Sequence, residues 1–317
     1  MATRSCLCVF LLLLVAFQPT MTMANPVLPS PRCSPVPGSN KEKFLFALNL
    51  HIYKAELFLR SSVGCGINDI SPGLVKGPAP IGATLADLDK RTRNFFEESG
   101  LAGMDISGSD RSMAMANILL LKTPIPMPLL DVRPQAYAKY FDAINVTLKP
   151  PINVYADVNS FVVASVYAPY HINQYYAGIM PSISGHRERE LAAGIALYEA
   201  ASYGVLRSLL NDAANSTVPP YTSTVVNFTS LTAQMTYQLG GCGVKDEPLI
   251  VPPPLGAEKR TTTNVIAADA NSLVYARTER EFLRILFRTG NATRPGGLFP
   301  CGFEGKLYHW ILALKQS

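Results

Sequence analysis

The sequence predicts a mostly helical protein built as a bundle, and three observations support this prediction. Apolar residues recur at helical spacing in several long segments, the clearest of which covers residues 186–212. Proline and glycine cluster between these segments. Few stretches show the strict alternation of apolar and polar residues that is typical of a half-buried strand. Several long helices with long connections indicate a helical bundle with crossovers.

The helical segments follow one another along most of the chain. Helices are expected at residues 43–62, 86–105, 109–121, 134–145, 157–178, 186–212, 221–239 and 277–288. A glycine- and proline-rich loop is expected at 64–83, and an extended crossover at 122–134. Pro169 lies inside the helix expected at 157–178 and predicts a kink there, because a proline removes a backbone hydrogen bond. The aromatic tail over 294–310 is expected to pack back on the body.

The first 24 residues are typical of a cleavable signal peptide. Arg4 precedes an apolar run of about a dozen residues, and Thr22-Met23-Ala24 supplies the small residues of a cleavage site. A membrane-spanning helix needs about 20 apolar residues, so neither this run nor any later one predicts a transmembrane anchor. After the leader we expect an irregular arm over 25–42, the bundle over 43–240 and an extension over 241–317 that packs on the bundle.

Four glycosylation sequons agree with export. Their asparagines are Asn145, Asn215, Asn227 and Asn291. Together with the leader they predict a secreted glycoprotein of the apoplast. The vacuole shares the same entry route and remains an alternative.

Four cysteines remain once the leader is removed: Cys33, Cys65, Cys242 and Cys301. An even number in an oxidising compartment predicts two disulfides, with three pairings open. The alternative is buried free thiols. No Cys-x-x-Cys motif occurs, which argues against a zinc site built from thiolates.

The charge of the chain is mildly basic and evenly spread. There are 28 basic and 23 acidic residues, a net charge of +5. The leader contains one basic and no acidic residue, which leaves 27 against 23, a net charge of +4. The basic residues form no stripe interleaved with aromatics, so no nucleic-acid partner is expected. No nucleophile-elbow motif supports a hydrolase.

Several short stretches occur in a distinctive order along the chain. They are 49–58 (NLHIYKAELF), 78–83 (PAPIGA), 128–131 (PLLD), 198–200 (YEA), 205–207 (VLR), 244–247 (VKDE), 251–252 (VP), 255–258 (LGAE) and 294–300 (RPGGLFP). In these stretches the sequence resembles the plant desiccation-related proteins, a secreted family with a ferritin-like domain. The resemblance implies an all-α fold in which a ferritin-like bundle with long crossovers carries an irregular C-terminal extension.

The resemblance also locates the positions of a metal centre on the first helix. Ferritin-like metal centres use carboxylates on facing helices and a Glu-x-x-His pair. On the first helix His51 and Lys54 occupy two positions at which the family has glutamate, and Glu56 alone matches.

Two further helices depart from the family pattern as well. The Glu-x-x-His pair becomes Glu98-Ser-Gly-Leu101, and the fourth-helix motif Glu-Ala-Gly-Gln-Asp becomes Glu199-Ala-Ala-Ser202-Tyr203. Neither an ammonium group nor a leucine can bind iron, so the resemblance predicts that the metal centre has been lost. No other cofactor is expected.

A polar cluster is expected to remain in the centre of the bundle. Its candidate residues are His51, Lys54, Glu98, Glu199 and Tyr203, joined by Tyr167, Tyr170 and His171 of the kinked helix. As the first hypothesis, these residues form a structural ion network in a non-catalytic, secreted protein of desiccation or stress responses.

The second hypothesis is a metal-independent acid–base enzyme or a small-molecule binder of plant specialised metabolism that uses the vacated pocket. In it Glu98 or Glu199 is the general base, and Lys54 or His51 is the acid or an electrostatic anchor. An open polar cavity would favour this hypothesis and a filled core the first one. A small molecule is therefore the partner left open, and so is the oligomeric state.

Overall fold

The computed structural model describes residues 31–104, 124–142, 147–245, 248–251 and 264–314. The chain divides into two units, Met1–Pro31 and Arg32–Ser317, and the fold described below belongs to the second unit. The predicted signal peptide, the predicted helix at 109–121 and the sequon at Asn145 lie outside the described residues.

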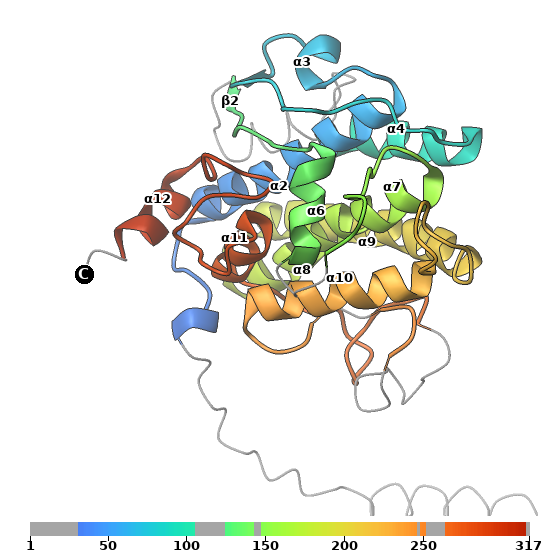
Figure 1. Cartoon of the computed structure of the whole chain (residues 1–317). Coiled ribbons are helices and arrows are strands. Elements are labelled where there is room, and N and C mark those ends of the chain that lie inside the picture. The colour runs from blue at the N-terminus through green and yellow to red at the C-terminus, as the bar shows by residue number, and fades with distance from the viewer. Residues whose placement is uncertain (1–30, 105–123, 143–146, 246–247, 252–263, 315–317) are drawn as a thin grey trace, which may run out of the picture. The chain divides into compact units, whose positions relative to one another are not determined.

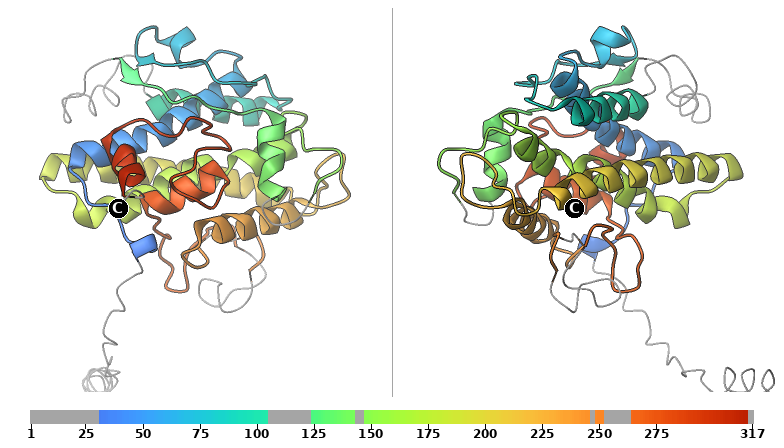
Figure 2. Two further views of the ribbon diagram at one scale, coloured as in Figure 1. Left: turned by 60° about the vertical axis from the view of Figure 1, so that its left-hand side comes forward. Right: turned by 90° about the vertical axis from the view of Figure 1, so that its right-hand side faces the viewer.

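Five helices form the bundle that the sequence predicts. They are α2 (Asn40–Ser62), α4 (Lys90–Met104), α7 (Val158–Ser165), α8 (Tyr167–Ile179) and α9 (His186–Asp212). Helix α2 packs against α4 and α8, and α8 packs against α9, with which it forms a helical hairpin through the short helix η2 (Met180–Ser182) (Figures 1 and 2). This arrangement confirms the predicted all-α class.

Helix α2 is the central element of the bundle. Ser39 and Glu42 form a capping box at its start, in which each side chain accepts a hydrogen bond from the backbone of the other residue. Most of its side chains are buried, including polar ones on both sides of the helix. A helix buried all round needs partners for those polar groups, and the site described below is the result.

The helix predicted at 157–178 is observed as two helices, α7 and α8, which meet at Val166. The backbone of Val166 is itself helical, with φ −55° and ψ −30°, so the chain continues from one helix into the other as expected for a kink. Pro169 has no N–H group to donate to the carbonyl of Ser165 four residues earlier, and its ring crowds that carbonyl. The proline therefore interrupts the helical hydrogen bonds in the turn that precedes it, where α7 meets α8.

The remaining elements cover and connect the bundle. They are η1 (Pro31–Cys33), α3 (Ile67–Ile70), β1 (Val75–Lys76), β2 (Ile125–Pro126), α6 (Pro134–Asp142), α10 (Val225–Gly240), α11 (Glu279–Phe287) and α12 (Lys306–Ala313). The two short strands pair in parallel and join the predicted loop at 64–83 to the predicted crossover. Helices α3 and α12 and both strands were not expected from the sequence.

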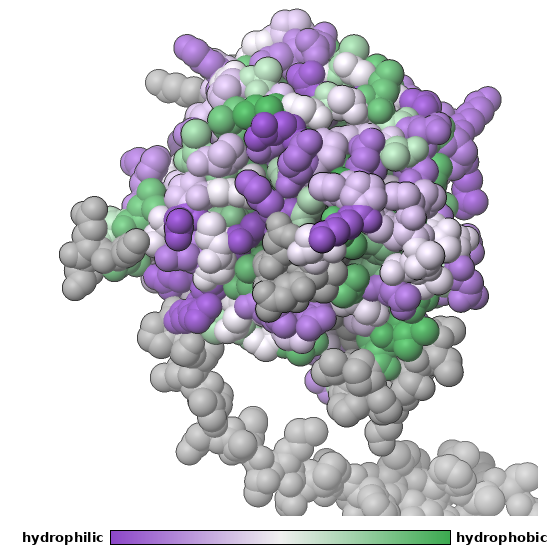
Figure 3. All heavy atoms as spheres, viewed as in Figure 1, coloured by the Kyte–Doolittle hydropathy of each residue, from purple (hydrophilic) through white to green (hydrophobic). Residues whose placement is uncertain are grey.

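The C-terminal helices pack on the bundle rather than apart from it. Helix α11 packs against α10, and α12 packs against α2 (Figure 1). The apolar side chains of α11, from Phe282 to Phe287, are fully buried. The face shown in Figure 3 is mostly hydrophilic, with small apolar patches between polar side chains. Among the described helices none is long and apolar enough to cross a membrane.

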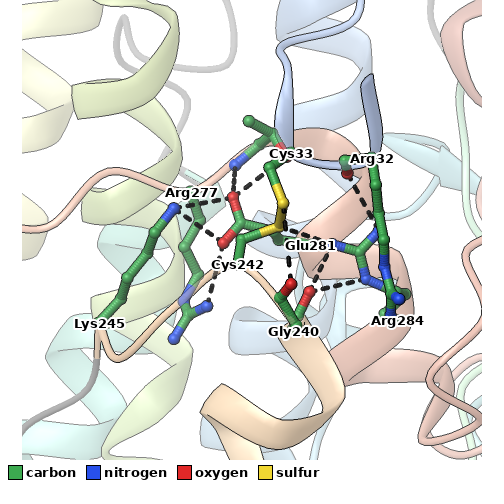
Figure 4. Close-up of a disulfide and its surroundings, with 10 residues drawn as sticks. Arg32, Cys33, Gly240, Cys242, Lys245, Arg277, Glu281 and Arg284 are labelled. Carbon is green, nitrogen blue, oxygen red and sulfur yellow. Dashed lines mark hydrogen bonds and ion pairs between the residues drawn. A yellow bond between two sulfur atoms is a disulfide. The ribbon is translucent and has the colours of Figure 1, made fainter. Parts of the chain in front are cut away.

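One disulfide joins Cys33 to Cys242 (Figure 4). It connects the segment that precedes α2 with the residue that follows the left-handed Gly241 at the end of α10. Cys65 and Cys301 are not joined, and both are exposed. The expectation of two disulfides is therefore met for one pair and is corrected for the other two cysteines.

Candidate functional site

A buried ion pair lies between α2 and α9. The ammonium nitrogen of Lys54 lies 2.7 Å from both carboxylate oxygens of Glu199 and donates a hydrogen bond to each. Both side chains are 0% exposed. The rings of Phe58 and Tyr198 lie 5.9 and 5.4 Å from the same nitrogen, within the range of cation–π attraction. Each charge thus has a partner that offsets its loss of hydration.

His51 extends this pair by one turn of α2. Its Nδ1 atom lies 3.9 Å from a carboxylate oxygen of Glu199, and its Nε2 atom lies 3.4 Å from the hydroxyl of Tyr176 on α8. The side chain is buried. Three helices therefore contribute to one polar cluster, which consists of His51, Lys54, Tyr176 and Glu199.

Tyr203 lies one turn beyond Glu199 on α9 but has a different environment. Its ring stacks on that of Tyr170 with centroids 4.1 Å apart and an interplanar angle of 10°. The guanidinium of Arg207 lies 5.8 Å from the Tyr203 ring, and the Tyr170 hydroxyl donates to the carbonyl of Lys245. The stack fixes α8 against α9 beside the polar cluster.

Glu98 does not join the cluster, which corrects the prediction that it would. Its side chain is exposed on α4 beside Lys90 and Asn94. The opposite side of α4, which includes Phe96 and Ser99, faces the core. A Cβ atom on Gly100 would lie 2.8 Å from Leu59, so the close approach of α2 at this glycine fixes the rotation of α4 and turns Glu98 outward.

Glu56 is buried, but its hydrogen bonds go to Arg60 and to the backbone after α2 rather than to the polar cluster. One carboxylate oxygen accepts from Arg60 at 2.6 Å, and the other accepts from the N–H of Ile67 at 3.0 Å. This carboxylate therefore fixes the turn after α2. It is not directed at Lys54 or Glu199.

The polar cluster does not suit a metal ion. Within the described residues, no group of three or more His, Cys, Asp or Glu side chains lies close enough together to hold one. In the cluster itself Glu199 already binds the ammonium of Lys54 with both oxygens, and a further cation there would be repelled by that ammonium. The donor set present does not fit a ferritin-like metal centre.

The ion pair is buried in the interior of the protein. Neither side chain has exposed surface. A hollow does occur nearby, between α8 and α10, but its lining includes His171 and Tyr167 and neither member of the pair. The structure thus separates the candidate residues into a closed ion pair and a cavity.

A second group of buried charges was missed by sequence reasoning. Glu281 accepts from Lys245 at 3.0 Å and from Arg277 at 3.4 Å (Figure 4). Arg284 donates to the carbonyl of Gly240 and lies 3.1 Å from the sulfur of Cys242. The four-residue spacing of the Arg277–Glu281 pair on an amphipathic helix was the available signal.

The sequons can be placed for three of the four asparagines. Asn215, Asn227 and Asn291 are exposed. The backbone N–H and the hydroxyl of Thr293 both donate to the side chain of Asn291 at 2.9 Å.

Comparison with known proteins agrees with the helical fold. The chain is 33% identical to the "Ferritin-like catalase Nec2" of Nesocodon mauritianus over 297 residues, which cover 90% of this chain and 93% of the relative. It is also 33% identical to the "Desiccation-related protein PCC13-62" of Craterostigma plantagineum over 276 residues, 86% of this chain and 85% of the relative. No protein-family model matches the chain, and no solved structure does. The chain therefore belongs to the plant family of desiccation-related proteins with a ferritin-like fold.

Proposed function

We propose that this chain is a non-catalytic, secreted member of its family, related to desiccation or stress, in which an ion pair replaces the metal centre. The observation that carries the proposal is the bidentate contact of Lys54 with Glu199 at 2.7 Å, with both groups fully buried. The ammonium supplies the positive charge that the Glu199 carboxylate requires in a low-dielectric core.

One relative is named a catalase, and we infer that this activity does not extend to the present chain. The resemblance places His51 and Lys54 at two positions where the family has glutamate, and Glu98 is exposed. The remaining donors are too few for the carboxylate-rich site of a ferritin-like centre.

Acid–base catalysis by the same residues is the weaker alternative. A general base must come within hydrogen-bond distance of the proton that it removes from a substrate. Glu199 has no exposed surface, and both of its oxygens already bind Lys54. The complete burial of both charges supports a structural role for the pair.

Elemental analysis tests the proposal. The protein should be secreted from a eukaryotic host in medium supplied with iron and manganese, purified without chelators, and assayed for bound metal and for peroxide consumption. We expect far less than one metal ion per chain and no peroxide consumption above the buffer blank. Stoichiometric iron or manganese, or enzymatic peroxide consumption, would overturn the proposal.

A pair of variants gives this experiment its controls. His51→Glu combined with Lys54→Glu returns two carboxylates to the centre and should increase bound metal. Lys90→Glu adds a carboxylate at an exposed position of α4 and should leave the metal content unchanged.

The proposed secretion has its own test. Export with cleavage after Ala24 leaves Asn25 as the N-terminus of the secreted protein. N-terminal sequencing should therefore begin at Asn25, and enzymatic removal of N-glycans should lower the mass. An uncleaved N-terminus together with an unchanged mass would argue against export.

A further inference from the structure

A partly open cavity lies between the bundle and the helices that cover it. Its walls include Tyr53 of α2, Tyr137 of α6, Val163 of α7, His171 of α8 and Met235 of α10. The hollow has an empty volume of about 490 Å³, counted with the open space at its mouth. An occupant must therefore be small.

The lining of this cavity selects against charged occupants. It consists of aliphatic, tyrosine, threonine, methionine and histidine side chains, with no carboxylate, ammonium or guanidinium group among them. A charged molecule would lose its hydration there without meeting a counter-charge. A neutral, largely apolar molecule meets no such penalty.

His171 is the polar group in this lining that lacks a protein partner. It is 3% exposed, and within the described residues neither of its ring nitrogens has a hydrogen-bond partner. Burial, with a smaller effect from the charge of Arg277, lowers its pKa to about 3, so the ring is neutral at physiological pH. A neutral imidazole has one N–H donor and one nitrogen acceptor.

Most of the other polar groups of the cavity already have partners. The Thr232 hydroxyl donates to a backbone carbonyl one turn earlier, so the Tyr167 hydroxyl, 3.2 Å away, donates to Thr232. The hydroxyls of Tyr53 and Tyr137 lie 3.3 Å apart. His171 is therefore the residue that can orient an occupant, once its ring turns one of the buried nitrogens towards the cavity.

We propose that this cavity binds a small neutral aromatic molecule with one hydroxyl group, of the phenol class, whose hydroxyl hydrogen-bonds to His171. A hydroxyl both donates and accepts, so it fits a neutral imidazole in either tautomer. The rings of Tyr53, Tyr137 and Tyr167 line the cavity and offer aromatic surfaces to the ring of the ligand. The site is distinct from the Lys54–Glu199 pair and does not depend on it.

Calorimetric titration with three related probes tests the proposal. Phenol carries the hydroxyl, benzene lacks it, and benzoate replaces it with a charge. The wild-type protein should bind phenol about five- to tenfold more tightly than benzene, as expected for one hydrogen bond in a buried site. Benzoate should not bind. Absence of phenol binding, equal affinity for phenol and benzene, or preferred binding of benzoate would each overturn the proposal.

A matched pair of histidine variants assigns the binding to this residue. His171→Leu should retain benzene binding and lose the preference for phenol. His309→Leu, at an exposed histidine of α12, should behave as the wild type. An unchanged preference for phenol in His171→Leu would refute the role of His171.

A measurement on the wild-type protein covers the case in which His171→Leu does not fold. Nitrogen-15 spectra of the histidine side chains should show the His171 ring resonances shifting as phenol is added, with those of His309 unchanged. If phenol binds and the His171 resonances stay in place, the proposed contact is wrong.

Discussion

Cys33 and Cys242 are joined across 209 residues of sequence, so the segment that leads into α2 is fixed to the end of α10. Arg284 of α11 lies against the sulfur of Cys242 and donates a hydrogen bond to the carbonyl of Gly240 (Figure 4). The disulfide thus joins the segment before α2 to the end of α10, and the hydrogen bonds of Arg284 attach α11 at the same place.

The first prediction concerns this bond. Cys33→Ser combined with Cys242→Ser should lower the free energy of unfolding by about 2–5 kcal/mol, because the open chain has more conformational freedom when unfolded. Chemical denaturation measures the change. Cys65→Ser with Cys301→Ser is the control, and it should remain within about 0.5 kcal/mol of the wild type, since both thiols are exposed and unjoined. A larger effect of the control pair would contradict the assignment.

The second prediction concerns the buried ion pair. Lys54→Met should lower the free energy of unfolding by about 3–5 kcal/mol, because it leaves the Glu199 carboxylate buried without its partner. Adding Glu199→Leu should recover much of this loss. Urea denaturation of the two single variants and the double variant gives the coupling free energy. A coupling near zero would show that the two charges do not interact.

The third prediction concerns acid stability. The pKa of His171 is lowered from 6.5 to about 3 in the folded protein, chiefly by burial. As pH falls, the His171 ring binds a proton in the unfolded chain before it does so in the folded protein. The contribution of His171 to stability is therefore lost as pH falls from about 6.5 towards 3. His171→Leu should flatten the melting temperature over this range, whereas His309→Leu should not. Parallel curves for the wild type and His171→Leu would contradict the assignment.

The fourth prediction has the opposite sign. Glu279 is buried, and this burial raises its pKa above the ordinary value of 4.5, although one oxygen accepts from the N–H of Val36 at 2.9 Å. The folded protein therefore holds this proton more tightly, and the group's contribution to stability is lost as pH rises above 4.5.

Glu279→Gln removes the charge and keeps an oxygen acceptor for Val36. At pH 7 it should melt at a higher temperature than the wild type, with the difference shrinking below about pH 4. Glu304→Gln changes an exposed carboxylate and serves as the control. A lower melting temperature for Glu279→Gln at pH 7 would show that the hydrogen bond matters more than the buried charge.

Local pattern predicted those parts of the fold that depend on local interactions. Helix α9 begins and ends at the predicted residues, 186 and 212, because its apolar spacing is regular and the flanking Gly185 has a positive φ of 89°. Helix α12 was not predicted, because its eight residues are too few to show a clear helical periodicity of apolar side chains.

Tertiary packing decided the rest of the site. The prediction that Lys54, His51 and Glu199 lie close together is confirmed, because the first and fourth helices of the bundle direct these side chains to one centre. The sequence misplaced Glu98, whose direction depends on how closely α4 approaches α2 at Gly100. The cavity beside His171 was not foreseen, since it arises from helices that are distant in sequence.

The contact between Lys54 and Glu199 also has a consequence for biosynthesis. A carboxylate that relies on a metal acquires its counter-charge after translation, from whatever ions the compartment provides. In this chain the counter-charge of Glu199 is the ammonium group of Lys54, which belongs to the same polypeptide, so each carboxylate has one cation. Under the proposed function, the centre of this bundle assembles during folding without a loading step, and a chelator should leave it unchanged.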